Sequence, residues 1–203
     1  MVYWLQEDEM RFFGSLGIVV LFAAAILGAP RPTLGASHVL TPASYATTSG
    51  AAGGQPAANL AVRDQAGTQN DWNRYVEFMP ANGAAYAGYR TYVAPAGVSP
   101  AALTGIQVQA NFLGPGPSDQ TWTWQIYSWS GAAWSPLGTN AGASWNGWTF
   151  LTFNATGALA NYVHPTSREL RIRLIASNAS DAADLDYEAI TLTTSDGPAT
   201  ATA

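Results

Sequence analysis

Three stretches of the sequence place aromatic rings among turn-forming residues, and two of them also carry amide or carboxylate side chains. They are residues 70–73 (NDWN), 86–89 (YAGY) and 145–148 (WNGW). A flat ring can cover the C–H face of a sugar, and amide or carboxylate groups beside it can bind the hydroxyls, so this combination is typical of carbohydrate recognition. The candidate ligand-binding residues are therefore Trp72, Asn73, Tyr86, Tyr89, Trp145, Asn146 and Trp148.

A second group of chemically useful side chains lies within eight positions near the C-terminal end. It consists of Asp181, Asp184, Asp186 and Glu188, and in a regular strand the last three share one face. Hard oxygen ligands close together suit calcium, so these four residues form a candidate calcium site. Two alternatives remain open: the carboxylates pair with Arg171 and Arg173 on a neighbouring strand, or they are simply solvated.

Catalytic motifs are weak in this sequence. It contains no Gly-x-Ser-x-Gly elbow, no His-Glu-x-x-His pair and no phosphate-binding loop, and we interpret both histidines, His38 and His164, as surface residues. Glycoside hydrolysis needs only two carboxylates. Asp71, Glu77, Asp119 and Glu188 could supply them, but nothing selects a pair, so we predict no catalytic residues.

The segments that must position these groups have the pattern of short strands. Residues 74–79, 87–93, 105–112, 122–129, 148–154, 169–176 and 187–193 alternate in polarity, and turn-forming clusters separate them. No stretch of the mature chain has a convincing helical period. We therefore predict an all-β fold, an antiparallel jelly-roll β-sandwich.

Alternation also assigns faces to the strands. Leu170, Ile172 and Leu174 are expected in the core, with Arg171 and Arg173 facing solvent. Trp124 and Ile126 share one face of their strand, and Gln125 and Tyr127 share the other, so the polar and aromatic outer faces could also bind a ligand. We expect Trp122, Trp124, Trp129 and Trp134 to serve packing or hairpin formation.

The N-terminal region reads as an export signal. An apolar run over residues 12–29 follows Arg11, and cleavage after Ala36 would release the mature chain. Translation could begin at Met10, and a retained membrane anchor is the alternative to cleavage. The expected organisation is a signal peptide over residues 1–36, a short mature N-terminus over 37–41, the β-sandwich over 42–194 and a flexible tail over 195–203.

Composition excludes some partners. Only 10% of residues are charged, the net charge is −5, and the chain contains neither lysine nor cysteine. A mildly acidic chain without a basic patch is a poor nucleic-acid binder, because neutralisation of phosphates supplies most of that affinity. We expect a protein outside the cytoplasm that touches no membrane after signal cleavage.

Several segments together resemble a known module. The hairpin at residues 124–137 (WQIYSWSGAAWSPL) ends one strand in two aromatics and returns with a tryptophan and a leucine, and it is similar to a β-sandwich module of secreted bacterial hydrolases, including polygalactosaminidase-like glycosidases. Other matching elements are Gly53-Gly54, Leu60, Asp64, residues 159–163 (LANYV), residues 169–173 (ELRIR) and Asp184-Leu185. The resemblance covers residues 42–194 and implies a galactose-binding-like, carbohydrate-binding-module-like fold with an accessory role.

The function that follows is binding without catalysis. We expect a secreted, monomeric module that recognises a polysaccharide or other glycan through loop aromatics and Asn or Asp groups. A structural calcium ion is the one cofactor that the sequence indicates. One alternative is a structural or adhesive envelope or matrix protein that self-associates through sheet edges or aromatic patches. The second alternative is a glycoside-active enzyme.

Overall fold

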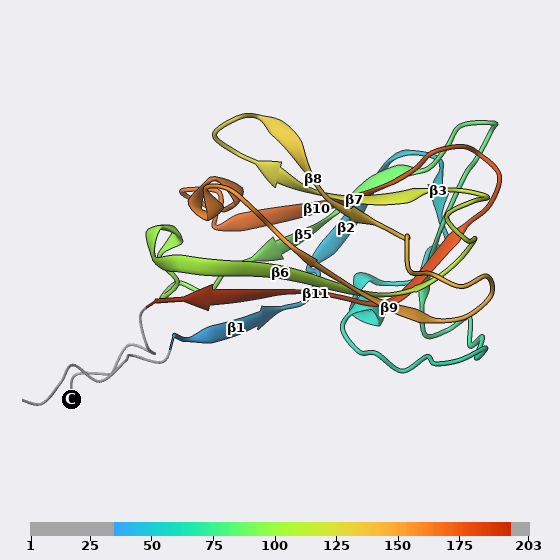
Figure 1. The fold of residues 1–203 in the computed structure, drawn as a ribbon, viewed down its shortest axis with the longest axis horizontal. Coiled ribbons are helices and arrows are strands. Elements are labelled where there is room, and N and C mark those ends of the chain that lie inside the picture. Colours follow the sequence, from blue (N-terminus) through green and yellow to red (C-terminus); the bar gives the residue numbers. More distant parts are fainter. Residues whose placement is uncertain (1–34, 196–203) are drawn as a thin grey trace, which may run out of the picture. The chain divides into compact units, whose positions relative to one another are not determined.

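The computed structural model describes residues 35–195, which form eleven strands and three short 3-10 helices (Figure 1). One antiparallel sheet contains β1 (Ser37–Leu40), β3 (Ala51–Ala52), β4 (Val76–Met79), β6 (Leu103–Leu113), β9 (Thr149–Asn154) and β11 (Ala183–Thr194). The other contains β2 (Ser44–Ser49), β5 (Ala87–Val93), β7 (Trp122–Ser128), β8 (Ala133–Thr139) and β10 (Glu169–Ala176). The 3-10 helices are η1 (Ala57–Leu60), η2 (Pro100–Ala102) and η3 (Leu159–Tyr162).

The two sheets form a β-sandwich, as predicted. The strand orders are β3-β4-β11-β6-β9 and β2-β5-β10-β7-β8, and β1 and β4 pair with successive parts of β11. From β4 to β11 the chain crosses between the sheets at every connection except the β7–β8 hairpin, which is the alternation of a jelly roll.

From residue 76 onward the predicted strands overlap every observed strand except β8, and 87–93 and 169–176 match to the residue. β11 begins at Ala183, four residues before the predicted range 187–193. The N-terminal part differs. Ser37–Leu40 pairs with β11, so the sandwich begins before the expected boundary at residue 42. The expected signal peptide lies almost entirely outside the described residues, as does the C-terminal tail beyond Ser195.

The chain has no helix, among residues 35–195, that is both long and apolar enough to cross a membrane.

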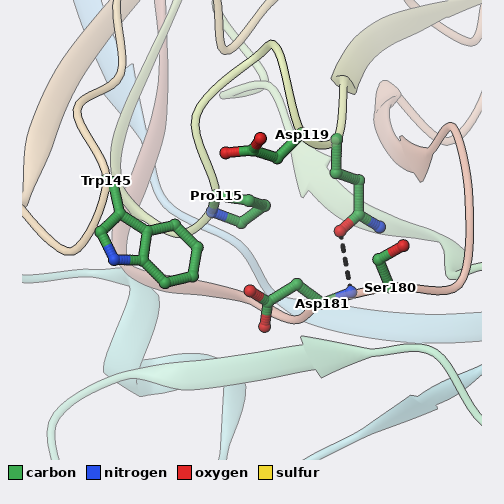
Figure 2. Close-up of a pocket in the computed structure, with 6 residues that line it drawn as sticks. Pro115, Asp119, Trp145, Ser180 and Asp181 are labelled. Carbon is green, nitrogen blue, oxygen red and sulfur yellow. Dashed lines mark hydrogen bonds between the residues drawn. The ribbon is translucent and has the colours of Figure 1, made fainter.

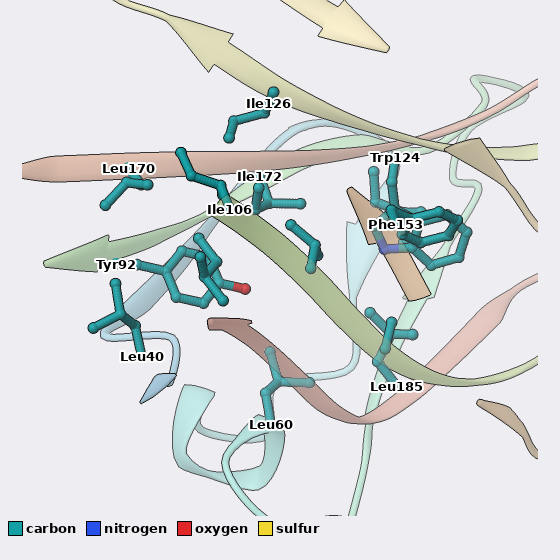
Figure 3. Packing of buried hydrophobic residues seen from close by; sticks show 14 of the residues in the cluster. Leu40, Leu60, Tyr92, Ile106, Trp124, Ile126, Phe153, Leu170, Ile172 and Leu185 are labelled. Carbon is teal, nitrogen blue, oxygen red and sulfur yellow. The ribbon is translucent and has the colours of Figure 1, made fainter. Parts of the chain in front are cut away.

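The core fills the space between the sheets (Figure 3). Leu170, Ile172 and Leu174 are fully buried, as their alternation predicts. Trp122 and Trp124 are also fully buried, and the Trp124 ring of β7 packs 5.2 Å from the Phe153 ring of β9, centroid to centroid. These aromatics therefore join the two sheets, as expected for packing residues.

One ion pair lies inside this core. The Arg90 Nε of β5 donates to Oε1 of Glu188 on β11 at 3.0 Å, and Arg90 Nη2 donates to Oε2. The Tyr92 hydroxyl donates to the same carboxylate, and Trp124 Nε1 donates to it at 3.2 Å. Because both charged side chains are fully buried, these donors replace the water that the Glu188 carboxylate loses on folding.

Candidate functional site

Trp145 is the most exposed large hydrophobic side chain among the described residues, with 65% of its surface accessible. It lies in the loop between β8 and β9, next to Asn146, whose φ of 55° supplies the turn. The loop begins at the buried Asn140, whose Nδ2 donates to the carbonyls of Pro115 (3.0 Å) and Gln120 (3.1 Å). These bonds fasten the loop to the neighbouring 114–121 connection, so the start of the loop that carries Trp145 is rigid.

Trp145 lines a hollow of about 420 Å³ together with Pro115, Asp119, Gln120, Ser180 and Asp181 (Figure 2). The buried Gln120 organises it: its Oε1 accepts from the Asp181 backbone N–H at 2.9 Å, and its Nε2 donates to the Asn178 carbonyl at 2.8 Å. Asp119 and Ser180, which line the same hollow, are exposed. The hollow thus offers a flat ring with carboxylate and hydroxyl groups around it, which suits a polyhydroxylated ligand.

A second, smaller hollow of about 170 Å³ adjoins the first, because Trp145 and Asp181 line both. Its other residues are Asn70, Glu77, Leu113, Gly114, Asn146, Ala182 and Asp184. We call the two together the Trp145 hollow. It is formed by the 114–121, 140–148 and 178–182 connections, the loop before β4, and the adjacent ends of β4, β6 and β11.

The smaller hollow is acidic. Asp184 lies directly opposite Glu77 in the pairing of β11 with β4. Burial, together with the charges of Glu77 and Asp181, raises the pKa of Asp184 from 3.8 to about 7. At neutral pH this carboxyl is therefore divided between its protonated and ionised forms, and the protonated form can donate a hydrogen bond.

The four predicted calcium ligands do not come together in the fold. The β11 strand has a bulge between Leu185 and Tyr187, which shifts the alternation by one residue. Asp184 therefore lines the hollow, whereas Glu188 lies inside the core with Arg90. Within residues 35–195, no cluster of three or more His, Cys, Asp or Glu side chains could hold a metal ion.

Asp186, the bulged residue, has a structural task instead. Its fully buried carboxylate accepts from the backbone N–H groups of Asp64 (3.0 Å) and Gln65 (2.5 Å), and from Asn111 Nδ2 (2.6 Å). These bonds fasten the 61–75 loop to the outer face of the six-stranded sheet. That loop carries Asn70, so Asp186 supports the Trp145 hollow indirectly.

The other predicted binding residues are scattered. Tyr86 is a correction: only 1% of its surface is exposed, because it packs in the core against Phe78 and Trp122. Tyr89 lies on the outer face of the five-stranded sheet. Of the seven candidates, the hollow brings together Trp145 and Asn146.

Trp72 and Asn73 lie in the 61–75 loop, and Trp148 contacts that loop. The Trp72 ring packs edge-on against Tyr75 at 6.3 Å, and Tyr75 packs against Trp148 at 5.7 Å. Trp148 Nε1 donates to the Gln69 carbonyl at 2.7 Å, so its indole has a structural partner. Trp72 remains 48% exposed, outside the residues that line the Trp145 hollow.

Sequence reasoning missed Pro115, Gln120 and Ser180 as site residues. They stand in connections of ordinary turn composition, far from residue 145 in the sequence, and only the jelly-roll crossings bring them together. Asp119 was considered only as a possible catalytic carboxylate. No local signal in the sequence identifies this group.

Comparison with known families matches residues 60–187 to the N-terminal glycosyl-hydrolase-114-associated domain. Among curated proteins, none matches. Among solved structures, a mutant of the family 29 carbohydrate-binding module CBM29-2 with mannohexaose is 11% identical, with a TM-score of 0.42 over 79% of this chain and 92% of that chain. The xylan-binding module CBM15 is 9% identical, with a TM-score of 0.42 over 81% and 99%.

The C-terminal extracellular domain of Mycobacterium tuberculosis EmbC is 14% identical, with a TM-score of 0.33 over 83% of this chain and 61% of that chain. At such values, what these proteins bind says nothing about the ligand of this chain.

Proposed function

Because the chain belongs to the family of N-terminal glycosyl-hydrolase-114-associated domains, we propose that it is a secreted, non-catalytic module that binds carbohydrate at the Trp145 hollow. The single observation that carries the proposal is the exposed indole of Trp145, which lines both adjoining hollows. The indole is an apolar ring exposed to water on a loop that hydrogen bonds hold in place. Covering it with a ligand removes apolar surface from water, which makes the free energy of binding more favourable.

The groups around the indole fit a sugar ring. The indole covers a C–H face, while the side chains of Asp119, Ser180 and Asp181 accept from or donate to hydroxyls at the rim. Because the base of the loop and Gln120 are already hydrogen-bonded, little conformational freedom remains to be lost on binding. The fold thus presents a site formed in advance of its ligand.

The experiment is a glycan-array screen of the wild-type domain, of Trp145→Ala and of Phe150→Ala. Phe150 is a matched control, because it is an exposed aromatic (37%) on the outer face of the six-stranded sheet. We expect Trp145→Ala to lose all or most of the signal and Phe150→Ala to keep it. Equal signals from both variants would contradict the proposal.

A glycoside-active enzyme is the second candidate, since Glu77 and Asp184 stand on adjacent strands and the pKa of Asp184 is raised to about 7. A raised acid beside another carboxylate is the usual arrangement of glycosidases. Reducing-sugar release from the array-positive glycan, abolished in Asp184→Asn, would favour this candidate over binding alone. Self-association is tested by size-exclusion chromatography, where the proposal expects a monomer.

A further inference from the structure

The outer face of the five-stranded sheet carries a second group of aromatic residues, separate from the Trp145 hollow. Because Leu170, Ile172 and Leu174 point into the core, the alternate positions of β10 and its neighbours point outward. We define the aromatic–arginine face as Tyr89, Gln125, Tyr127, Trp129, Trp134, Arg171 and Arg173. All seven side chains are half-buried.

The register explains how these side chains meet. Arg173 of β10 lies opposite Tyr89 of β5 on one side and opposite Gln125 of β7 on the other. Tyr127 of β7 lies opposite Trp134 of β8, and their ring centroids are 5.0 Å apart. Four neighbouring strands thus contribute to one continuous surface.

Both arginines lie against aromatic rings. The guanidinium of Arg171 lies 4.7 Å from the ring centroid of Trp129 and 5.0 Å from that of Tyr89, and the guanidinium of Arg173 lies 4.6 Å from that of Trp134. Such cation–π contacts fix both partners in position. The face is therefore ordered before any ligand arrives.

The two cations differ in their partners. Arg171 pairs with Glu169, whereas no carboxylate of the described chain lies within ion-pair distance of Arg173. Arg173 Nε donates to Oε1 of Gln125 at 2.7 Å, and Nη2 donates to the same oxygen. A guanidinium has five N–H donors, so Arg173 retains donors that can take an incoming oxygen anion. Partial burial lowers the pKa of Arg173, since desolvation disfavours the charged form until an anion compensates it.

A hollow of about 340 Å³ extends the face beyond Trp129. The His164 ring packs 4.5 Å from Trp129, and its Nδ1 accepts from the backbone N–H groups of Thr166 and Ser167. In the neutral ring Nε2 is therefore the protonated nitrogen, a donor. Together with the exposed amide of Asn161, it adds donor groups at this end of the surface.

We propose that the aromatic–arginine face is a second carbohydrate site, which takes a polysaccharide of uronic acids, with a sugar ring against Trp134 and Tyr127 and a carboxylate on Arg173. Charge complementarity selects this class. The whole chain is acidic, with a net charge of −5, but this face carries two arginines, and the one carboxylate beside them, Glu169, is already paired with Arg171. A neutral glycan would leave the donors of Arg173 without an anion.

The test is affinity electrophoresis at low salt, in gels containing polygalacturonate or, as the neutral counterpart, galactan. The variants are Arg173→Gln, Arg173→Lys and Trp134→Ala. Arg63→Gln is the matched control, because Arg63 also lies over an aromatic ring, at 4.3 Å from the Phe150 centroid, away from this face. Circular dichroism and thermal midpoints verify that each variant folds.

We expect polygalacturonate to retard the wild type, and both Arg173→Gln and Trp134→Ala to weaken the apparent affinity at least about tenfold. The apparent affinity of Arg173→Lys should lie between those of the wild type and Arg173→Gln, since lysine keeps the charge but lacks the planar guanidinium fork. Arg63→Gln should match the wild type. If Trp134→Ala fails to fold, Arg173→Gln carries the test.

Trp145→Ala must retain binding to polygalacturonate, which separates this site from the Trp145 hollow. The proposal is overturned if polygalacturonate does not retard the wild type, or if Arg63→Gln weakens binding as much as Arg173→Gln. Loss of polygalacturonate binding in Trp145→Ala would overturn it as well, because the two surfaces would then be one site.

Discussion

At the scale of single residues, the carboxylates of β11 have two different roles: some stabilise the fold, and one lines the Trp145 hollow. The sequence does not distinguish these roles. Glu188 is fully buried and accepts hydrogen bonds from Arg90, Tyr92 and Trp124, so it holds the two sheets together. Burial and the charge of Glu188 raise the pKa of Tyr92, which keeps its hydroxyl protonated as a donor. Asp184, four positions earlier, faces the hollow instead.

The substitution Glu188→Ala tests the structural task. It leaves the Arg90 guanidinium buried without its counter-ion, and we expect the free energy of unfolding to fall by about 3–5 kcal/mol. Urea denaturation followed by tryptophan fluorescence measures it. Glu169→Ala is the control, because its pair with Arg171 is partly solvated and contributes about 0–1 kcal/mol. Similar losses in both variants would contradict this assignment.

Asp184 gives the domain a pH dependence with a defined sign. Its pKa is about 7 in the folded chain and near 3.8 when unfolded, so the folded state binds the proton more tightly. The stability associated with this proton is complete below about pH 4 and is lost as the pH rises to about 7. Asp186 acts in the same direction, because burial raises its pKa too.

We therefore expect Asp184→Asn to raise the thermal midpoint relative to the wild type, with a gain that grows between pH 4 and pH 7 and is constant above. Melting curves at several pH values measure it. Asp119→Asn, at an exposed carboxylate of the larger hollow, should give no such growing gain. A constant difference between Asp184→Asn and the wild type over this range would show that Asp184 does not titrate there.

At the scale of elements, the alternation of apolar and polar residues predicted the central strands well. It failed where a bulge interrupts a strand or where a strand has few apolar residues. The pattern of Leu170, Ile172 and Leu174 identifies β10, because one face is buried along its whole length. β2 was missed, since Ala, Ser and Thr dominate it and none of its side chains is fully buried. β1 was missed because it has four residues, of which Leu40 alone is buried. The bulge in β11 misplaced Glu188, because period two no longer holds across it.

The same limit applies to the candidate site. Trp145 and Asn146 were identified because exposed aromatics beside turn residues leave a local pattern. Tyr86 has the same local pattern but precedes β5 as a core residue. Pro115, Gln120 and Ser180 depend on which connections meet at one end of the sandwich, which no local pattern encodes.

The 61–75 loop gives an element-scale prediction, because Asp186 fastens it through the backbone of Asp64 and Gln65. In Asp186→Ala these donors and Asn111 lose their acceptor, so we expect faster hydrogen exchange over residues 64–75 and a loss of about 1–3 kcal/mol in stability. Hydrogen exchange read by mass spectrometry measures it. Unchanged exchange in this loop would contradict the role given to Asp186.

At the scale of the whole molecule, the sandwich places two kinds of surface apart from each other. One is the acidic Trp145 hollow, and the other is the arginine-bearing outer face of the five-stranded sheet. The domain belongs to the family of N-terminal glycosyl-hydrolase-114-associated domains, which accords with an accessory task beside a hydrolase.

The most direct measurement is an NMR titration of the ¹⁵N-labelled domain with the oligosaccharide that gives the strongest array signal. We expect the indole N–H signal of Trp145, assigned by its disappearance in Trp145→Ala, to shift together with the backbone amides of Gln120, Ser180 and Asp181. Shifts confined to other tryptophans, with the Trp145 signal unmoved at saturation, would contradict it.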